Sequence, residues 1–163
     1  MNKEQKIILV VDDAIFQLMN IGVQIEKLLK GEKEISQERI AVHSSNSEDV
    51  VIELENKIVL VRRAKTINDA IKATIKITKG YPNQMVAVIL DLTMPFCGGI
   101  EAAKSFSDVF PELVPIVLVN SAIAGGSIAE QLQDLGYQHI TKKPPADEFI
   151  EHLIAILKKS NVL

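Results

Sequence analysis

The stretch VAVILDLTMPFCGG, residues 86–99, decides the fold of this chain. Five apolar residues, Val86–Leu90, lead without interruption into Asp91, and a Met-Pro pair and a Gly-Gly pair follow. A strand that is buried on both faces of a parallel sheet has such a continuous apolar run, because helices cover both sides of the sheet. We therefore predict a central strand that presents Asp91 at the carboxyl edge of the sheet, where open α/β sheets bind their ligands.

The composition of the whole chain is that of one globular domain. Its 163 residues fit a single domain, and a hydrophobic content of 47% is enough for a packed core. No apolar run is long enough to cross a membrane, and the polar start MNKEQK is not a signal peptide. We therefore expect a cytoplasmic protein without membrane insertion. The net charge of −3 comes from charges mixed along the chain, so we expect no direct nucleic-acid binding.

Strand-like and helix-like patterns alternate along most of the chain. Besides Val86–Leu90, the expected core strands are Ile7–Val11, Ile58–Val61, Pro115–Val119 and Gln138–Thr141. The expected helices run from Ala14 to Gly31, over Thr66–Lys79 and Gly99–Val109, from Ser127 to Gly136, and over Asp147–Lys159. This alternation predicts a parallel sheet with helices on both faces.

Two helices carry more detailed expectations. In the helix Thr66–Lys79, the spacing of Ile67, Ile71 and Ile75 places all three on one buried face. The later helix opens with Ser127-Ile128-Ala129-Glu130, which has the pattern of a capping box with Ser127 as the N-cap.

The segment of roughly residues 32–57 is the least regular part of the sequence. Val50–Leu54 and Ile58–Val61 are two β-branched runs separated by three polar residues, which favours a hairpin whose second arm is a core strand. Ser47 followed by Glu48-Asp49 leaves a short helix as the alternative. The segment is expected to be a surface extension at the edge of the sheet, or else an element that docks a partner or a second copy.

Reactive side chains follow four of the predicted strands. They are Asp12-Asp13, Asp91, Ser121 and Lys143. The carboxyl ends of parallel strands meet at one edge, so we expect these groups to converge. Three carboxylates together favour a hard divalent cation such as Mg²⁺, and a lysine and a hydroxyl suit a phosphoryl group. The set predicts a carboxylate that accepts phosphate.

The motifs around these residues occur in a fixed order. They are IILVVDD (Ile7–Asp13), DLTMPFCGG (Asp91–Gly99), VLVNSA (Val117–Ala122) and Lys143-Pro144. Together they resemble the receiver domain of two-component response regulators, including the single-domain chemotaxis regulators. The resemblance covers nearly the whole chain apart from roughly residues 32–57. It implies a three-layer α-β-α sandwich with a five-stranded parallel sheet of flavodoxin-like order 2-1-3-4-5.

The resemblance also implies a metal site. Asp13 would bind Mg²⁺ directly, and Asp12 would help through water. Asp91 and the backbone carbonyl of Thr93 would complete the protein ligands. No other cofactor is implied.

For the phosphoryl group, the resemblance implies that Asp91 is the phosphoacceptor. It would attack a phosphohistidine on a sensor histidine kinase or a histidine phosphotransfer protein. Ser121 would donate a hydrogen bond to a phosphoryl oxygen, and Lys143 would pair with the phosphoryl group. The family usually has a cis peptide before the proline at position 144, which would aim Lys143 at the site.

The chain departs from the family in two ways. Asp13 and Asp91 lie 78 positions apart, which indicates an insertion after the first helix. The aromatic residue that the family has three positions before its lysine is Ile140 here. Tyr137 lies three residues further back, and in a strand it would face the opposite side from Ile140.

Two functions of different kinds follow from these observations. The first is a stand-alone receiver, since the chain ends just after the fifth core helix, that switches the binding of an unknown target or relays the phosphate. It would be a signalling phosphoacceptor rather than an enzyme, catalysing only its own phosphorylation and a slow hydrolysis of the aspartyl phosphate. Slow hydrolysis is implied because Thr93 and Ile123, where the family influences the approach of water, are uncharged. The alternative is a receiver-fold binding or scaffold module that works without phosphorylation.

Other readings of single residues are simpler. Taken alone, Asp12-Asp13 could simply cap the following helix, and Asp91 could simply be a loop or cap residue. Cys97 has no flanking base or second cysteine, so a small packing residue is favoured over a redox sensor. The three histidines, at positions 43, 139 and 152, share no spacing, and we interpret them as ordinary polar residues. A hydrolase of the haloacid dehalogenase type would need a second aspartate at the position of Thr93, which argues against that class.

Overall fold

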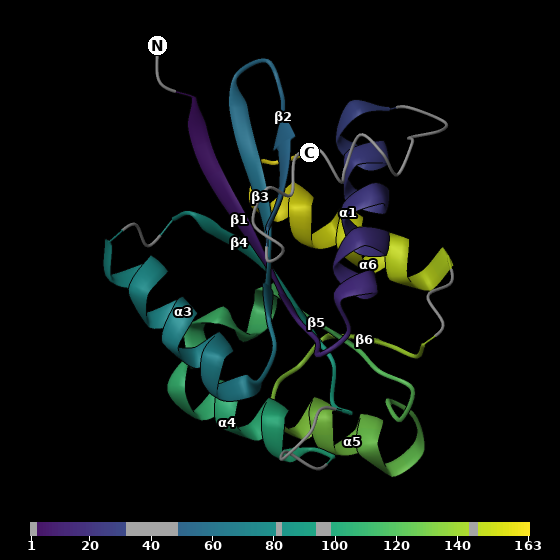
Figure 1. Cartoon of the computed structure of the whole chain (residues 1–163). Helices are drawn as coiled ribbons and strands as arrows, with labels where there is room; N and C mark the ends of the chain where they lie inside the picture. The colour runs from purple at the N-terminus through teal and green to yellow at the C-terminus, as the bar shows by residue number, and fades with distance from the viewer. Residues whose placement is uncertain (1–2, 32–48, 81–82, 94–98, 144–146) are drawn as a thin grey trace.

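The computed structural model describes residues 3–31, 49–80, 83–93, 99–143 and 147–163 (Figure 1). The strands are β1 (Glu4–Val11), β2 (Asp49–Glu53), β3 (Lys57–Ala64), β4 (Met85–Leu90), β5 (Val117–Asn120) and β6 (His139–Thr141). The helices are α1 (Ile15–Lys30), α3 (Ile67–Gly80), α4 (Glu101–Val109), α5 (Gly126–Asp134), α6 (Asp147–Lys159) and the 3₁₀ helix η1 (Pro111–Ile116). No helix in the described ranges is long and apolar enough to span a membrane.

The six strands form one sheet in the order β2-β3-β1-β4-β5-β6. All pairs are parallel except β2 with β3, which is antiparallel. Without β2, the order of the five core strands is 2-1-3-4-5, so the predicted topology is confirmed. The continuous apolar run over Val86–Leu90 is buried throughout, as a central parallel strand requires.

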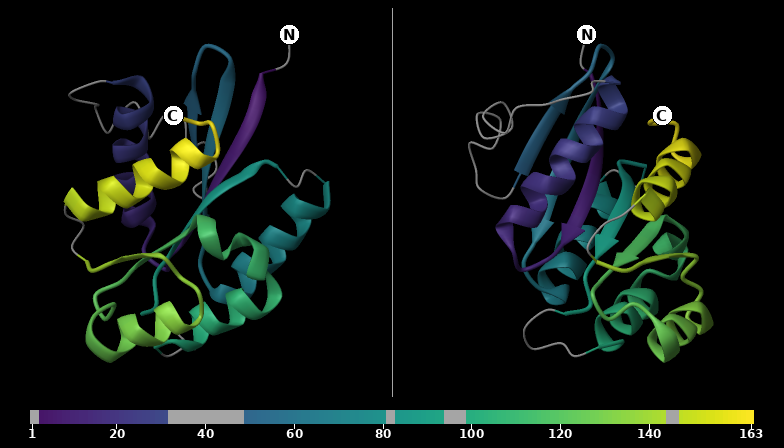
Figure 2. Two further views of the ribbon diagram at one scale, coloured as in Figure 1. Left: turned by 180° about the vertical axis from the view of Figure 1, so that it is seen from behind. Right: turned by 90° about the vertical axis from the view of Figure 1, so that its right-hand side faces the viewer.

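Helices cover the two faces of the sheet, and each face has its own core (Figure 2). On one face α3, α4 and α5 pack over alternate strand residues such as Val11, Leu90 and Val119. On the other face α1 and α6 pack over the residues between them, such as Val10 and Leu118. The alternation of side chains along each strand assigns its buried apolar residues to one core or the other.

The hairpin predicted within the irregular segment is present as β2 and β3. Val50 and Ile52 of β2 face α1 and are buried, so β2 extends the core at the edge of the sheet. Gly22 lies in the middle of α1, and a Cβ built on it would be 3.2 Å from Val50 Cγ1. The lack of a side chain at Gly22 lets β2 approach α1 closely. The part of the insertion from 32 to 48 lies outside the described residues.

Several predicted boundaries and one predicted face are wrong. Pro115 belongs to η1, and β5 begins only at Val117, since a proline cannot donate to the ladder. α5 begins at Gly126 after Gly125 as its N-cap, with no side-chain cap, so Ser127 is inside the first turn. Ile75 is 47% exposed. A spacing of four residues drifts around a helix of 3.6 residues per turn, and here it carries Ile75 off the buried face.

Candidate functional site

Asp12 and Asp91 extend two neighbouring strands by one residue. The Asp12 N–H donates to the Ala64 carbonyl and the Asp91 N–H donates to the Val11 carbonyl, each at 3.0 Å. The parallel ladder therefore continues to these residues and holds both backbones in place. Both carboxylates are buried, whereas Asp13 is exposed. One carboxylate oxygen from each of these three aspartates lies within 4.8 Å of the others, as the convergence of strand ends predicts.

Lys143 reaches this cluster from beyond the end of β6. Its Nζ lies 2.7 Å from Asp12 Oδ2 and 3.0 Å from Asp91 Oδ2. Burial disfavours the charged ammonium, but the hydrogen bonds and charges of the two carboxylates outweigh it and raise the pKa of Lys143. The lysine is therefore a permanent cation beside Asp91 at neutral pH.

Asp91 is held at both of its oxygens. Its Oδ1 accepts hydrogen bonds from the backbone N–H of Thr93 at 3.0 Å and from the Thr93 hydroxyl at 2.9 Å. Its Oδ2 accepts from Lys143. Burial favours the neutral acid, but the Thr93 N–H and the Lys143 ammonium more than offset it and lower the pKa of Asp91. Asp91 is thus an ionised, fixed carboxylate. The Thr93 hydroxyl bond was not predicted, and the role of the Thr93 carbonyl as a ligand stays a prediction.

Ser121 lies next to the cluster at the end of β5. Its N–H donates to the Thr141 carbonyl and its carbonyl accepts from the Lys143 N–H, each at 3.2 Å. These bonds continue the pairing of β5 with β6 by one more residue on each strand, to Ser121 and Lys142. The Ser121 side chain is buried, and its Oγ has no hydrogen-bond partner among the described residues. A buried hydroxyl of this kind suits an anionic ligand.

Asp12 does not cap α1, because the N-cap of that helix is Ala14, without a side-chain cap. Asp12 Oδ1 accepts from the Ala14 N–H at 2.9 Å, just before α1 begins. Its other oxygen contacts Lys143, so one carboxylate fixes the loop and contributes to the cluster. The predicted residues Cys97, Pro144 and His43 lie outside the described residues.

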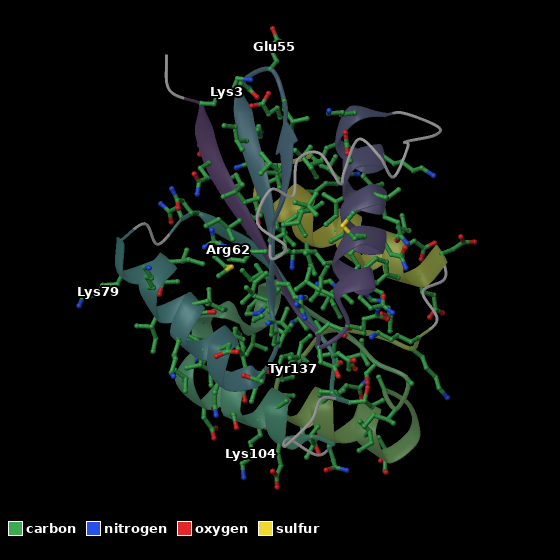
Figure 3. All side chains as sticks on the ribbon, in the orientation of Figure 1. Lys3, Glu55, Arg62, Lys79, Lys104 and Tyr137 are labelled. Atoms are coloured by element: carbon green, nitrogen blue, oxygen red, sulfur yellow. The ribbon has the colours of Figure 1, made fainter. Side chains whose placement is uncertain are left out.

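The expectation about Tyr137 is wrong. Tyr137 precedes β6 instead of lying in it, so the alternation of strand faces does not apply. Both Tyr137 and Ile140 pack against the core under α3, α4 and α5. The Tyr137 side chain is labelled in Figure 3. Its ring is fully buried, and its hydroxyl donates to the Ala103 carbonyl of α4. Tyr137 thus ties the start of β6 to α4 and is fixed inside the core.

Three features of the structure were not predicted from the sequence. Arg63 Nη1 donates to the Asp13 carbonyl at 3.1 Å, a contact visible only once β3 pairs with β1. Asn120 is buried at the end of β5, and its position after three apolar residues was the signal that could have found it. His139 Nδ1 lies 2.8 Å from His152 Nδ1, and this contact joins β6 to α6. No spacing pattern in the sequence indicates it.

Comparison with known proteins bears on the fold. No family model matches the sequence, and no curated protein matches it. A response regulator receiver domain protein from Clostridium thermocellum has a similar solved structure, with a TM-score of 0.56 and 17% identity. The similarity covers 96% of this chain and 98% of that one. The chain has the receiver-domain fold.

Two further structures show the same receiver fold. The non-phosphorylated HemR receiver domain from Leptospira biflexa matches with a TM-score of 0.54 and 21% identity, over 94% of each chain. A chain of the CheX–CheY–BeF₃–Mg²⁺ complex from Borrelia burgdorferi matches with a TM-score of 0.58 and 17% identity, over 94% of this chain and 90% of that one. The described part of the chain adds the strand β2 to the five core strands of this fold.

Proposed function

We propose that the chain is a receiver that accepts a phosphoryl group on Asp91 from a phosphohistidine of a partner protein. One observation carries this proposal: Asp91 is buried, ionised and held at both oxygens, beside Lys143 and the two other aspartates. This cluster stands at the carboxyl edge of a receiver fold, where such sheets bind ligands. The partner is a sensor histidine kinase or a histidine phosphotransfer protein, and phosphorylation switches the binding of a target or passes the phosphoryl group on.

The donor set of the site fits Mg²⁺. Asp12, Asp13 and Asp91 supply carboxylate oxygens within 4.8 Å of one another, and hard oxygen ligands are what Mg²⁺ prefers. The Thr93 carbonyl is proposed as the backbone ligand. The bound ion would neutralise negative charge on the carboxylates and on the phosphoryl oxygens.

The transfer itself needs few protein groups. A carboxylate oxygen of Asp91 forms a bond to phosphorus while the N–P bond of the donor histidine breaks, and its electron pair stays on the imidazole. Lys143, kept protonated by its neighbours, pairs with the phosphoryl oxygens. The Ser121 hydroxyl donates a hydrogen bond to one of these oxygens. Positioning and charge are the main contributions to such a reaction.

A binding module that ignores phosphorylation is the second candidate. Two residues favour it: Ile140 is not aromatic, and Tyr137 is buried in the core and hydrogen-bonded to α4, so neither provides an aromatic side chain that can change position on phosphorylation. The buried Lys143–Asp91 contact argues against it, since a scaffold has no need for an ionised carboxylate that burial destabilises.

Phosphorylation tests the two candidates directly. The protein is treated with acetyl phosphate and Mg²⁺, or with a phosphorylated histidine kinase, and analysed by intact mass spectrometry. We expect one phosphoryl group that hydroxylamine removes in the wild type, as for an acyl phosphate, and none in Asp91→Asn. Asp108→Asn, an exposed aspartate in α4, is the matched control and should be phosphorylated normally. Unmodified wild type with both donors would contradict the proposal and favour the binding module.

A further inference from the structure

Asn120 is a polar residue in a buried apolar strand. It ends β5 after Val117, Leu118 and Val119, and it is 1% exposed. Burying an amide is unfavourable unless its donors and acceptor form hydrogen bonds. A further role is therefore expected for this side chain.

The strand register places Asn120 beside Asp91. Leu90 of β4 pairs with Val119 of β5, so the next residues, Asp91 and Asn120, are neighbours across the two strands. On its other side Asn120 pairs with Thr141 of β6. Paired residues of neighbouring strands project from the same face of a sheet. Asn120 thus lies in one row with the proposed phosphoacceptor and with Thr141.

Thr141 fixes the orientation of the Asn120 amide. The Thr141 hydroxyl donates to Asn120 Oδ1 at 3.1 Å, and its other acceptor, the Val119 carbonyl, is 3.5 Å away. The shorter bond holds the oxygen of the amide toward β6. The amide nitrogen, Nδ2, is then the group available for a further partner, and it has none among the described residues.

The site gains anionic oxygens exactly when Asp91 is phosphorylated. Before that, Lys143 and Thr93 satisfy both oxygens of Asp91. The phosphoryl group brings further oxygens that need donors. Two consecutive residues at the end of β5, Asn120 and Ser121, each have a buried polar atom able to donate and without a partner in the described structure.

We propose that the Asn120 amide donates a hydrogen bond to the phosphorylated Asp91 side chain. This inference rests on the proposed phosphorylation of Asp91. It makes Asn120 a specific donor for the aspartyl phosphate, which stabilises the modified state and not the unmodified one. Removing the amide should therefore weaken anion binding and leave Mg²⁺ binding unchanged.

Beryllofluoride with Mg²⁺ is the probe, because it binds a carboxylate as a phosphoryl mimic. Binding is followed by ¹⁹F NMR, together with Mg²⁺ affinity by calorimetry and the thermal midpoint of the metal-free protein. In Asn120→Val we expect the half-saturating beryllofluoride concentration to rise about tenfold or more, as for a lost bond to a charged group. We expect the Mg²⁺ affinity to stay within about twofold. The thermal midpoint should fall, because the single variant leaves the buried Thr141 hydroxyl without its nearer acceptor.

Three further variants sharpen the test. The double variant Asn120→Val/Thr141→Val removes both polar partners, so no buried hydroxyl is left without its acceptor. It serves if the single variant folds poorly, and it should show the same loss of anion affinity. Thr141→Val removes the anchor of the amide and should give a smaller loss. Asn83→Val, an exposed asparagine before β4, is the control and should bind like the wild type.

The outcomes separate this inference from the proposed function. Wild type that fails to bind beryllofluoride would overturn both. Wild type that binds it, together with an Asn120→Val protein that binds within twofold as well, would overturn only the role of Asn120. An equal loss of Mg²⁺ and beryllofluoride affinity would also overturn it, because a general disturbance of the site would then explain the result.

Discussion

Lys143 Nζ lies 3.0 Å from Asp91 Oδ2, although the two residues are 52 positions apart in the chain. The lysine starts beyond the end of β6, and its side chain passes the end of β5 to reach Asp91 after β4 and Asp12 after β1. One ammonium group thus compensates two buried carboxylates. A divalent cation that binds the same carboxylates would compete with Lys143 for them, and this competition makes the site sensitive to both metal and charge.

Replacing Lys143 by methionine should raise the pKa of Asp91. The Thr93 N–H still opposes the effect of burial on this carboxyl, but the Lys143 ammonium no longer does. In the wild type the folded pKa of Asp91 lies below the unfolded one, so Asp91 contributes stability above about pH 4 that is lost as the pH falls through its folded pKa. The variant should lose the part of this contribution that Lys143 provides, and it should be phosphorylated about 10²-fold more slowly. Carboxyl ¹³C NMR titration measures the pKa of Asp91, and urea unfolding between pH 3 and 7 measures the stability. An unchanged Asp91 titration would contradict the prediction.

Replacing Asp13 by asparagine should separate metal binding from stability. Without metal, the variant should be at least as stable as the wild type, because one charge of a repelling cluster is removed. At a Mg²⁺ concentration one hundred times its dissociation constant, the wild type should gain about 2.7 kcal/mol, and the variant should gain almost nothing. Thermal unfolding with and without Mg²⁺ tests this, with Asp108→Asn as control. An equal gain in both proteins would exclude Asp13 as a ligand.

Gly22 should be coupled to Val50 in stability. Alanine at position 22 improves helix propensity by about 1 kcal/mol, but its Cβ would lie 3.2 and 3.3 Å from the two methyl groups of Val50. We expect Gly22→Ala to lower the free energy of unfolding by about 1 kcal/mol in the wild type. In a Val50→Ala background the same change should be neutral or stabilising. Denaturant unfolding of the four proteins gives the coupling; the same effect in both backgrounds would refute the close packing of β2 on α1.

Most of the sheet could be predicted because buried parallel strands appear in the sequence as short continuous apolar runs. The runs Ile7–Val11 and Val86–Leu90 have no competing interpretation, and each delivers aspartates to the same edge. The meeting of Asp12, Asp91 and Lys143 followed from topology alone. The first and last residues of helices and strands were harder to predict where neighbouring residues favour different structures. Proline at 115 belongs to a 3₁₀ turn, which apolar periodicity does not reveal.

Contacts that depend on register could not be predicted. The row that contains Asp91, Asn120 and Thr141 exists only once Leu90 is known to pair with Val119. In the same way, the burial of Tyr137 depends on where β6 begins, which the sequence leaves open by a few residues. These are packing relationships between elements, and no spacing within one element encodes them.

The His139–His152 contact should make stability depend on pH. Burial, His152 and Lys159 lower the pKa of His139. On the neighbouring strand β5, His139 is paired with the apolar Leu118. The unfolded chain binds a proton near pH 6.5 that the folded chain binds only at lower pH. Stability from this group is therefore complete above about pH 6.5 and is lost as the pH falls below it.

Urea unfolding at several pH values between 5 and 8 checks this dependence. His139→Gln keeps a polar side chain that does not titrate, so its stability should change less with pH than that of the wild type. An identical pH profile in wild type and His139→Gln would show that the buried histidine does not contribute.

The aspartyl phosphate should be long-lived. Hydrolysis requires a water molecule that is oriented for attack on phosphorus, and an acidic or amide side chain near the phosphoryl group can hold one. Thr93 is exposed but its hydroxyl is already bound to Asp91, and Ile123, in the loop after Ser121, is apolar and 37% exposed. Neither offers a base to the water. Replacing Ile123 by glutamate should therefore shorten the lifetime several-fold, and Ile123→Leu should leave it unchanged. Loss of radioactive phosphate from purified protein measures both, and rapid loss from the wild type in the absence of any phosphatase would mean that another group activates the water.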